Sequence, residues 1–255
     1  MPRFLAISPH LDDAAFSCGG TLARLAAEGW QGTWATVFTA SVPNPTGFAL
    51  ACQLDKGLGP EIDYMALRRG EDAVAAAALG LDAPRFLPFR EAPHRGYESA
   101  KALFGATLPD DAVVEPVAAA LAGLLDETRP DLVLAPQAIG GHVDHVQLVR
   151  ALDEAGRAAP VLWWRDFPYT VREASPPEPF GERMAALPEV DIRFDDAALA
   201  AKRAACAAYA SQIGFQFGGL EGLDWRLAAS GHAESFRLNG ALPASLEPLV
   251  RAVPA

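Results

Sequence analysis

The amino-acid sequence predicts an α/β fold: a mostly parallel, doubly wound sheet with helices on both of its faces. Short apolar runs alternate with alanine-rich amphipathic stretches along the chain, which is typical of such sheets. No internal repeat interrupts this alternation, and 51% of the 255 residues are hydrophobic. A chain of this length and composition suits a single compact domain over residues 1–255 with a sizeable core.

The first half of the chain contains five predicted elements. In order they are a strand over 4–7, a helix over 13–28, a strand over 33–39, a helix over 65–79 and a strand over 85–89. The strands are short apolar runs, as expected for strands that are buried on both faces. Leu22 and Leu25 give the first helix an apolar face, and Gly80 is typical of the residue just beyond a helix C-terminus.

The second half continues the alternation. Its predicted elements are a helix over 111–127, a strand over 131–135, a helix over 145–157, strands over 161–164 and 190–194, and a helix over 196–210. The acidic pair Asp110 and Asp111 favours a helix N-terminus, and Pro130 lies beyond the end of that helix. From Ile213 onward we expect turns and one short helix.

Three long segments are predicted to be loops, because they contain prolines and glycines and show no regular apolar period. They cover residues 40–62, 90–110 and 166–188. Long loops in compact domains are usually functional or disordered, so we expect these three to wall a cleft beside the sheet.

Two short segments concentrate histidines and carboxylates. The chain has five histidines, and three of them lie in these segments. The first segment reads Ser8-Pro9-His10-Leu11-Asp12-Asp13, and the second reads Gly141-His142-Val143-Asp144-His145. Each follows a predicted strand, and parallel sheets bind ligands at the carboxyl ends of their strands, so we expect the two segments to meet there.

Histidine and carboxylate side chains are ligands that suit zinc or iron(II). A catalytic zinc ion usually has three protein ligands and a water, and His10, Asp13 and His145 would supply such a set. The other polar members of the two segments, which are Asp12, His142 and Asp144, would then serve the chemistry or orient the ligands. Taken singly, each segment has a simpler interpretation as a helix cap or a solvated helix start. Their pairing at two strand ends favours the metal site.

The composition argues against several classes of partner. The net charge is −11 and no lysine- and arginine-rich run is present, so nucleic acid and anionic membrane surfaces are not expected partners. Three scattered cysteines make neither a disulfide framework nor a cysteine zinc site. No segment resembles a membrane span or a signal peptide, so we expect a cytoplasmic protein. No heptad or apolar stripe identifies an interface, and a homo-oligomer stays an open alternative.

These motifs resemble the signature pair of the LmbE/PIG-L-like N-deacetylases, commonly Ala-His-Pro-Asp-Asp-Glu and His-Pro-Asp-His. Further segments that resemble the family are Gly19-Gly20-Thr21-Leu22-Ala23, Arg68-Arg69-Gly70-Glu71, Arg165-Asp166-Phe167-Pro168-Tyr169, and Lys202 with Tyr209-Ala210-Ser211-Gln212. Leu11 and Val143 stand where proline is common in the family, and Ala14 stands where glutamate is common. The resemblance implies a Rossmann-like fold and a bound zinc ion, with iron(II) as the alternative metal.

The resemblance also implies a reaction, the hydrolytic removal of an N-acetyl group from an N-acetylglucosamine-type sugar or its conjugate. It carries the metal ligands over to His10, Asp13 and His145, and the general base to Asp12. Asp12 would accept a proton from the metal-bound water as this water attacks the amide. His142, when protonated, would stabilise the oxyanion or pass a proton to the departing amine.

Four more side chains have expected roles near the site. Asp144 would hold one of the histidines in its useful tautomer. Arg68 resembles a family residue that contacts substrate oxygens, and an ion pair with Glu71 on the same helix face is an equal alternative. Trp163 and Trp164 are candidates for sugar stacking, but adjacent strand residues point to opposite faces, so at most one reaches the cleft.

The sequence leaves more than one function open. Within the deacetylases, the substrate is a small N-acetyl sugar, a conjugate in the biosynthesis of a bacillithiol-like low-molecular-weight thiol, or a glycolipid or glycosylated natural product. A non-catalytic sugar-binding relative is a further alternative, against which the intact Asp12 argues. A nucleotide-binding protein is disfavoured, because no glycine-rich phosphate loop follows the first strand.

Overall fold

The computed structural model describes residues 1–156, 159–172 and 174–252. It contains a mixed sheet with the strand order β3-β2-β1-β4-β5-β7-β6-β8. Strands β3, β2, β1, β4 and β5 pair in parallel, whereas β7, β6 and β8 extend the sheet with antiparallel pairings. The strands are β1 (Arg3–Ser8), β2 (Gln31–Thr36), β3 (Arg85–Phe86), β4 (Leu132–Pro136), β5 (Val161–Trp164), β6 (Glu189–Arg193), β7 (Ala233–Asn239) and β8 (Val250–Ala252).

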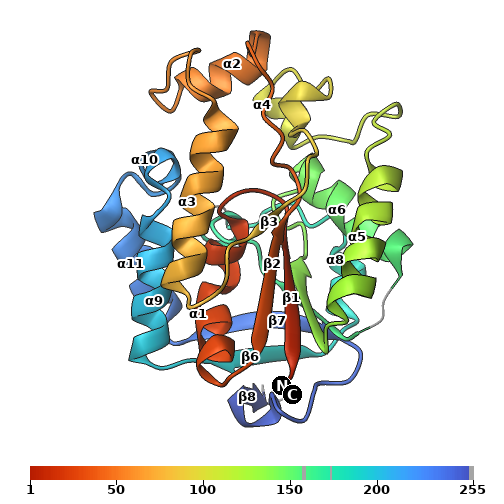
Figure 1. Cartoon of the computed structure of the whole chain (residues 1–255), viewed down its shortest axis with the longest axis vertical. Coiled ribbons are helices and arrows are strands. Elements are labelled where there is room, and N and C mark those ends of the chain that lie inside the picture. The colour runs from red at the N-terminus through yellow and green to blue at the C-terminus, as the bar shows by residue number, and fades with distance from the viewer. Residues whose placement is uncertain (157–158, 173, 253–255) are drawn as a thin grey trace.

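Helices cover both faces of this sheet, as predicted (Figure 1). One layer consists of α1 (Asp13–Ala27), α3 (Tyr64–Ala78), α9 (Asp196–Ala207), α10 (Ala210–Phe217) and α11 (Leu220–Ser230). The other layer consists of α5 (Val114–Thr128), α6 (Val143–Ala155) and α8 (Gly181–Ala185). The short helices are α2 (Gly47–Leu54), α4 (Ala100–Leu103) and α7 (Tyr169–Arg172), with 3-10 turns η1 (Ala92–His94) and η2 (Glu247–Leu249). Within the described ranges, no helix is both long and apolar enough to cross a membrane.

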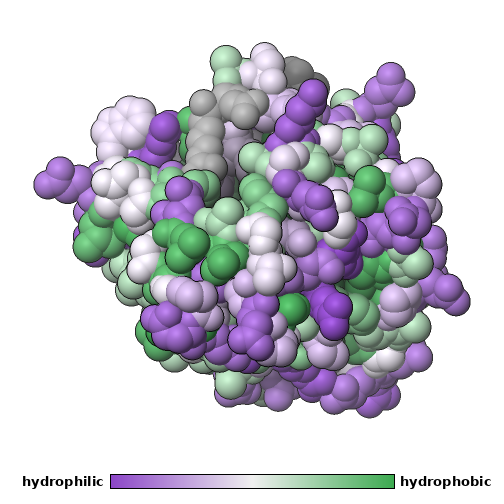
Figure 2. Space-filling model, turned by 90° about the horizontal axis from the view of Figure 1, so that it is seen from above, coloured by the Kyte–Doolittle hydropathy of each residue, from purple (hydrophilic) through white to green (hydrophobic). Residues whose placement is uncertain are grey.

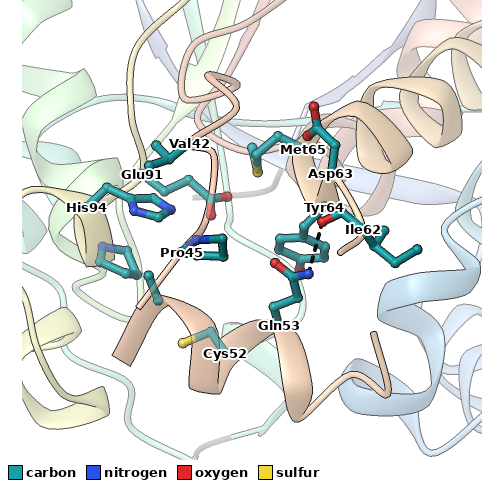
Figure 3. Close-up of a pocket in the computed structure, with 12 residues that line it drawn as sticks. Val42, Pro45, Cys52, Gln53, Ile62, Asp63, Tyr64, Met65, Glu91 and His94 are labelled. Carbon is teal, nitrogen blue, oxygen red and sulfur yellow. Dashed lines mark hydrogen bonds between the residues drawn. The ribbon is translucent and has the colours of Figure 1, made fainter. Parts of the chain in front are cut away.

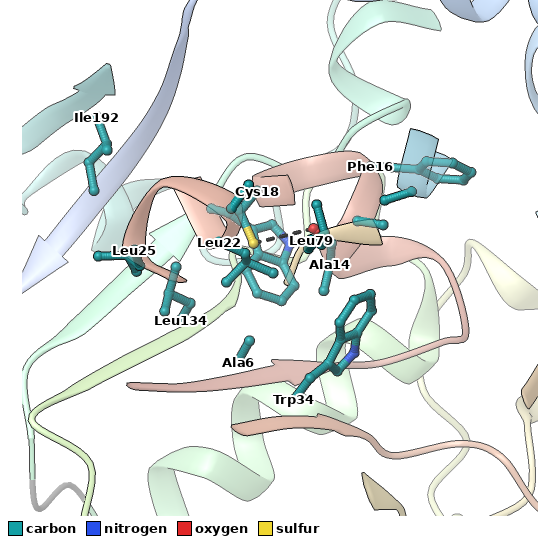
Figure 4. Close-up of a cluster of buried hydrophobic side chains, with 14 of the residues drawn as sticks. Ala6, Ala14, Phe16, Cys18, Leu22, Leu25, Trp34, Leu79, Leu134 and Ile192 are labelled. Carbon is teal, nitrogen blue, oxygen red and sulfur yellow. Dashed lines mark hydrogen bonds between the residues drawn. The ribbon is translucent and has the colours of Figure 1, made fainter. Parts of the chain in front are cut away.

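The central strands are apolar on both faces because successive side chains alternate between two cores. Phe4 and Ala6 of β1 belong to the core cluster on the side of α1, whereas Leu5 and Ile7 belong to the cluster on the side of α5 and α6. Figure 4 shows the first of these clusters, where Leu22 of α1 lies over Ala6. This double burial explains why the strand appears in the sequence as a continuous apolar run.

The prediction of three long loops is wrong in part, because each of them contains at least one short helix. Helix α2 lies within residues 40–62, α4 and η1 lie within 90–110, and α7 and α8 lie within 166–188. The longest of them, α2, has eight residues, which is too short for an apolar period to be recognised. Figure 1 shows α2 and α4 above the carboxyl ends of the parallel strands.

Two predicted helix starts are also corrected. The helix predicted over 111–127 begins at Val114, and the side chain of Asp111 does not cap it but accepts hydrogen bonds from Arg95 and Tyr97. The helix predicted over 145–157 begins two residues earlier, at Val143, and its predicted last residue lies outside the described residues.

The tail beyond residue 213 contains more regular structure than predicted. Helices α10 and α11 are followed by β7, which lies between β5 and β6 in the sheet. Along β7 the buried residues Glu234, Phe236 and Leu238 alternate with half-buried ones. Its partners are far away in the sequence, so the short alternation alone did not identify this strand.

Helix α1 is interrupted at Cys18, whose φ of −137° and ψ of 18° are not helical. Just after this break, Glu234 of β7 accepts hydrogen bonds from the backbone N–H groups of Gly20 and Thr21, at 3.0 and 2.7 Å. Lys202 of α9 donates to the same carboxylate at 2.6 Å. The first helix is therefore fastened to the last third of the chain by buried, charge-assisted hydrogen bonds.

Candidate functional site

The two histidine segments meet at the carboxyl ends of β1 and β4, as the sequence predicts. His10 lies in the turn between Ser8, the last residue of β1, and Asp13, the first residue of α1. His142 is the N-cap of α6, and His145 lies in the first turn of that helix. The ring centroid of His10 is 4.8 Å from that of His142 and 5.1 Å from that of His145.

Asp13 lies between two of the histidines. Its Oδ2 atom is 3.2 Å from Nδ1 of His10 and 3.2 Å from Nε2 of His145. Two atoms bound tetrahedrally to one zinc ion at about 2.0–2.1 Å are roughly 3.3 Å apart, so these spacings fit a shared metal ion. Nε2 of His145 is buried and forms no hydrogen bond in the described part of the chain.

His142 adds a third nitrogen to this place. Ligand atoms of His10, His142 and His145 all lie within 4.8 Å of one another. The Oδ2 atom of Asp13 lies only 3.2 Å from a ring nitrogen of His10 and of His145. These shorter distances favour the predicted ligand set of Asp13, His10 and His145. The group as a whole could hold a metal ion.

A carboxylate behind each of the two outer histidines orients its ring. Asp144 accepts a hydrogen bond from Nε2 of His10 at 2.9 Å, so His10 is the histidine that Asp144 orients. Asp166 pairs in the same way with Nδ1 of His145 at 2.8 Å. Such outer carboxylates fix the tautomer of a metal-binding histidine and strengthen it as a ligand. No role was predicted for Asp166, although its position just after the strand 161–164 was a usable signal.

The electrostatics of this cluster favour a positive charge. Burial lowers the pKa of His145, but the carboxylates of Asp13 and Asp166 outweigh burial and raise it to about 9. Burial raises the pKa of Asp13, but His145 and His10 outweigh burial and hold it well below the ordinary value. A buried anion of this kind is stable only beside cations, and a bound metal ion is one way to supply them.

Asp12 lies beside the cluster and not within it. It is the N-cap of α1, its φ of 155° is rare for a residue with a side chain, and it is only 4% exposed. Burial raises the pKa of its carboxyl to about 7, and the guanidinium of Arg68, with Nη2 at 3.6 Å from Oδ2, opposes that rise. Asp12 can therefore exchange a proton near neutral pH.

Arg68 is buried at the site and does not form the predicted alternative ion pair on the helix surface. Its Nη1 donates to Glu91 at 2.7 Å, and its Nη2 donates to the backbone carbonyl of Leu11 at 3.0 Å. Glu71 instead accepts hydrogen bonds from the backbone N–H and the hydroxyl of Ser211. Arg68 is thus held with its guanidinium beside Asp12.

His142 is neutral in this arrangement. Its Nδ1 accepts a hydrogen bond from the backbone N–H of Asp144 at 3.2 Å, so the ring proton is on Nε2. Burial, together with the positive charge of His10, lowers the pKa of His142 to about 3. The sequence-based interpretation invoked a protonated His142, whereas this geometry favours a neutral hydrogen-bond donor.

Arg95 connects the predicted loop 90–110 to the site, and nothing in the sequence indicated it. Its Nη1 is 2.8 Å from Oδ1 of Asp144, and its Nε and Nη2 each donate to Asp111 at 3.0 Å. The guanidinium also lies 5.0 Å from the ring centre of Phe38. Arg95 therefore restrains the carboxylate that orients His10.

A cavity of about 510 Å³ opens above these groups. The three segments predicted to wall a cleft all contribute to it, through residues of α2, α4 and α7. Trp163 and Trp164 do not, because both are fully buried in opposite core clusters. The cavity is lined by His10, Asp12, Asp13, Phe48, Ala51, Cys52, Asp55, Lys56, Tyr64, Arg68, Glu91, Pro93, Ala100, Leu103, Phe104, His142, Asp144, Tyr169, Gln212, Phe215 and Gln216.

A much smaller cavity of about 30 Å³ adjoins the first, between α2, the start of α3 and the turn η1 (Figure 3). The two cavities share Cys52, Tyr64, Glu91 and Pro93. Gln53 closes one side by donating to the backbone carbonyl of Ile62 at 3.0 Å. The smaller cavity has room for about one water molecule, so it does not extend the substrate site.

Comparison with known proteins identifies the family. The sequence profile of the GlcNAc-PI de-N-acetylase (PIG-L) family matches residues 5–156, which is more than half of the chain and includes both histidine segments. The chain belongs to the PIG-L family. The family resemblance inferred from the two motifs is thereby confirmed.

Members of the PIG-L family with named activities are similar to this chain. It is 36% identical over 169 residues to the 2'-N-acetylparomamine deacetylase of Streptomyces fradiae, an alignment that covers 66% of this chain and 57% of the relative. It is 34% identical over 181 residues to the 1D-myo-inositol 2-acetamido-2-deoxy-alpha-D-glucopyranoside deacetylase of Streptomyces griseus, covering 66% of this chain and 53% of the relative. The chain thus spans about half the length of these curated relatives.

Solved PIG-L-like structures match over a larger share of the chain. The zinc-inhibited form of teicoplanin deacetylase superposes with a TM-score of 0.76 at 28% identity, and covers 92% of this chain and 97% of that one. This agreement extends to the antiparallel part of the sheet, beyond the residues that the family profile matches.

Proposed function

We propose that this protein is a zinc-dependent hydrolase that removes the N-acetyl group from an N-acetylglucosamine-type sugar or sugar conjugate. The observation that carries the proposal is the placement of Asp13 between His10 and His145, with the separate carboxylate of Asp12 in the same cavity. The named deacetylase activities of the relatives support the same reaction. Iron(II) suits the same ligands, so it is the alternative metal.

His10, Asp13 and His145 would hold the metal, with Asp144 and Asp166 fixing the two rings from behind. When bound there, the metal supplies Lewis-acid activation of a water molecule and of the amide carbonyl. The buried position of the three ligands keeps their rotamers fixed, which preserves the geometry of the site during the reaction.

Asp12 acts as the general base. Its carboxyl, with a pKa of about 7, accepts the proton of the attacking water and delivers it to the nitrogen of the departing amine. The guanidinium of Arg68 keeps Asp12 in place and binds hydroxyl oxygens of the sugar. Neutral His142 donates a hydrogen bond through Nε2–H to the amide oxygen as negative charge develops on it.

Replacement of Asp12 tests this assignment. In Asp12→Asn we expect kcat for amine release from methyl 2-acetamido-2-deoxy-glucopyranoside to fall by about 10²–10⁴-fold, because the general base is lost. The metal content should stay at that of the native chain, because Asp12 is not a ligand. Asp82→Asn, an exposed aspartate, is the matched control. Turnover that survives in Asp12→Asn would show that another group is the base.

Metal content tests the ligand set independently of activity. Anaerobically purified native protein should contain about one zinc or iron per chain, and His145→Ala should contain almost none. His232→Ala is the control, since that ring lies at the surface and pairs with Asp196. A native chain that stays metal-free after reconstitution would refute the proposed hydrolase.

A further inference from the structure

The cavity above the site has two chemically different parts. Its floor carries the histidines and carboxylates of the site, together with Arg68. Three helices contribute apolar side chains to the rest of the lining, next to polar residues such as Asp55, Lys56, Gln212 and Gln216. We call these apolar side chains the apolar wall, which consists of Phe48 and Ala51 of α2, Ala100, Leu103 and the adjoining Phe104 of α4, and Phe215 of α10.

Two of the phenylalanines in this wall are unusually exposed. Phe104 is 44% exposed and Phe215 is 56% exposed, although side chains of this kind are normally buried. Seen from above, the face over the strand ends shows hydrophobic side chains among hydrophilic ones (Figure 2). Exposed apolar side chains that line a concave site usually mark the place of an apolar ligand group.

The apolar wall is continuous with the catalytic floor. The ring of Phe104 lies 5.3 Å from the ring of His142 and 5.9 Å from that of Tyr169, centre to centre. At the far side, Nζ of Lys56 lies 4.6 Å from the ring centre of Phe215. A group bonded to a sugar on the floor would therefore extend along the rings of Phe104 and Phe215.

We propose that the apolar wall binds an apolar aglycone, alkyl or aromatic, of the amino-sugar substrate. This inference rests on the proposed function, because the same floor must hold the N-acetyl sugar. A polyhydroxylated aglycone would leave the rings of Phe104 and Phe215 in contact with water, whereas an apolar one would cover them and gain their burial. A second protein chain does not suit this surface, because it would block access to Asp12 and His142.

The test compares glycosides that differ only in the aglycone. Methyl, hexyl and phenyl 2-acetamido-2-deoxy-glucopyranosides are incubated with the metal-loaded protein, and the released amine is quantified. We expect kcat/KM for the hexyl or the phenyl glycoside to exceed that for the methyl glycoside by about tenfold or more. A preference for one of the two distinguishes an alkyl from an aromatic aglycone. Equal values for all three substrates would overturn the proposal.

Two variants locate the effect on the wall. Phe215→Ser and Phe48→Ser should bring the hexyl-to-methyl ratio of kcat/KM close to one, mainly by raising KM for the hexyl glycoside. Trp225→Ser is the matched control, because Trp225 is a 64% exposed aromatic on α11 that does not line the cavity. A ratio that survives in both variants would show that the preference arises elsewhere.

Binding separates failure of this inference from failure of the proposed function. Hexyl and methyl glucosides without an acetamido group are titrated into the protein by calorimetry, where no reaction is needed. One outcome is that no substrate is deacetylated, while hexyl glucoside still binds about tenfold more tightly than methyl glucoside and binds Phe215→Ser less tightly. The apolar wall would then be supported as a binding site, and the proposed hydrolase activity would be refuted. If the protein is a dimer that Phe215→Ser dissociates, with the hexyl preference unchanged, the wall is an interface between copies and the proposal is wrong.

Discussion

Asp12 and Asp13 are neighbours in the chain, but the pKa values of their carboxyls are shifted in opposite directions. Burial dominates at Asp12 and raises its pKa to about 7. At Asp13 the effect of burial is outweighed by His145 and His10, which hold the pKa well below the ordinary value. One carboxyl can therefore stay charged beside a cation while the other exchanges a proton, which is how paired carboxyls divide their work in hydrolases.

Arg95 is the residue whose loss we expect to destabilise the site most. It lies between Asp111 and Asp144, and its side chain is only 11% exposed. Arg95→Met removes a buried cation, so the buried carboxylates of Asp111 and Asp144 lose the ion pairs that they form with it. We expect the free energy of unfolding of the metal-free protein to fall by about 3–5 kcal/mol, measured by urea denaturation.

The control for this prediction is a pair at the surface. Arg203 donates to Asp224, and their side chains are 50% and 43% exposed. Because water screens that pair, Arg203→Met should lower the free energy of unfolding much less than Arg95→Met does. Similar losses in the two variants would mean that Arg95 contributes no more than a surface residue.

At the scale of elements, the close packing of α1 against Phe194 requires a glycine at position 20. A Cβ atom at Gly20 would lie 2.5 Å from the ring of Phe194, which is itself buried. Gly20→Ala should therefore lower the free energy of unfolding by about 1–3 kcal/mol, through overpacking. Gly123 of α5 is the matched case, because it is exposed and nothing lies within 4 Å of its Cβ position. Gly123→Ala should raise the free energy of unfolding by about 1 kcal/mol, and chemical denaturation of both variants would show whether the signs differ.

The elements with a continuous or periodic apolar pattern were predictable, and those whose pattern is short or interrupted were not. The strand over 161–164 and the helix from residue 13 were predicted because their apolar residues are continuous or periodic within one segment. Strand β7 was missed because one of its three buried positions is Glu234, so only Phe236 and Leu238 indicate an apolar face. Helix α2 was missed because its eight residues are too few to show a period.

The same distinction applies to the site. The residues of the two motifs, which are His10, Asp12, Asp13, His142, Asp144 and His145, are brought together because both motifs follow parallel strands. Arg95 and Glu91 were not predicted, since they reach the site from a segment without a motif. The roles of the motif residues stay predictions until the variants proposed above are measured.

At the scale of the whole molecule, the buried carboxyl of Asp72 connects the sheet with two segments of one helical layer. Asp72 of α3 accepts hydrogen bonds from the hydroxyl of Tyr209 at 2.6 Å and from that of Thr36 in β2 at 2.8 Å. Burial nevertheless raises its pKa from the ordinary 3.8 to about 7, although both hydrogen bonds oppose this rise. The folded protein therefore holds a proton here that the unfolded chain has already lost.

This predicts how stability changes with pH. Because the folded pKa of Asp72 is raised to about 7, the native state binds more protons than the unfolded state between pH 4 and 7. The contribution of Asp72 to stability is present below pH 4 and is lost as the pH rises through 7. Relative to Asp72→Asn, the free energy of unfolding of the native sequence should fall by an amount on the order of 4 kcal/mol between pH 4 and 8.

The measurement is urea denaturation of both proteins with chelator present, so that metal binding does not change with pH. Asp82→Asn, at an exposed position, controls for the general effect of losing one negative charge. A difference between the native sequence and Asp72→Asn that stays constant with pH would show that Asp72 does not titrate in this range.

The carboxylate of Glu234 lies 214 positions along the chain from the backbone N–H of Gly20 that it binds. During synthesis the sequence of α1 leaves the ribosome long before that of β7, which holds the partner for its interrupted turn. A nascent chain therefore carries the histidine segments long before the helix that begins at Asp13 can be completed.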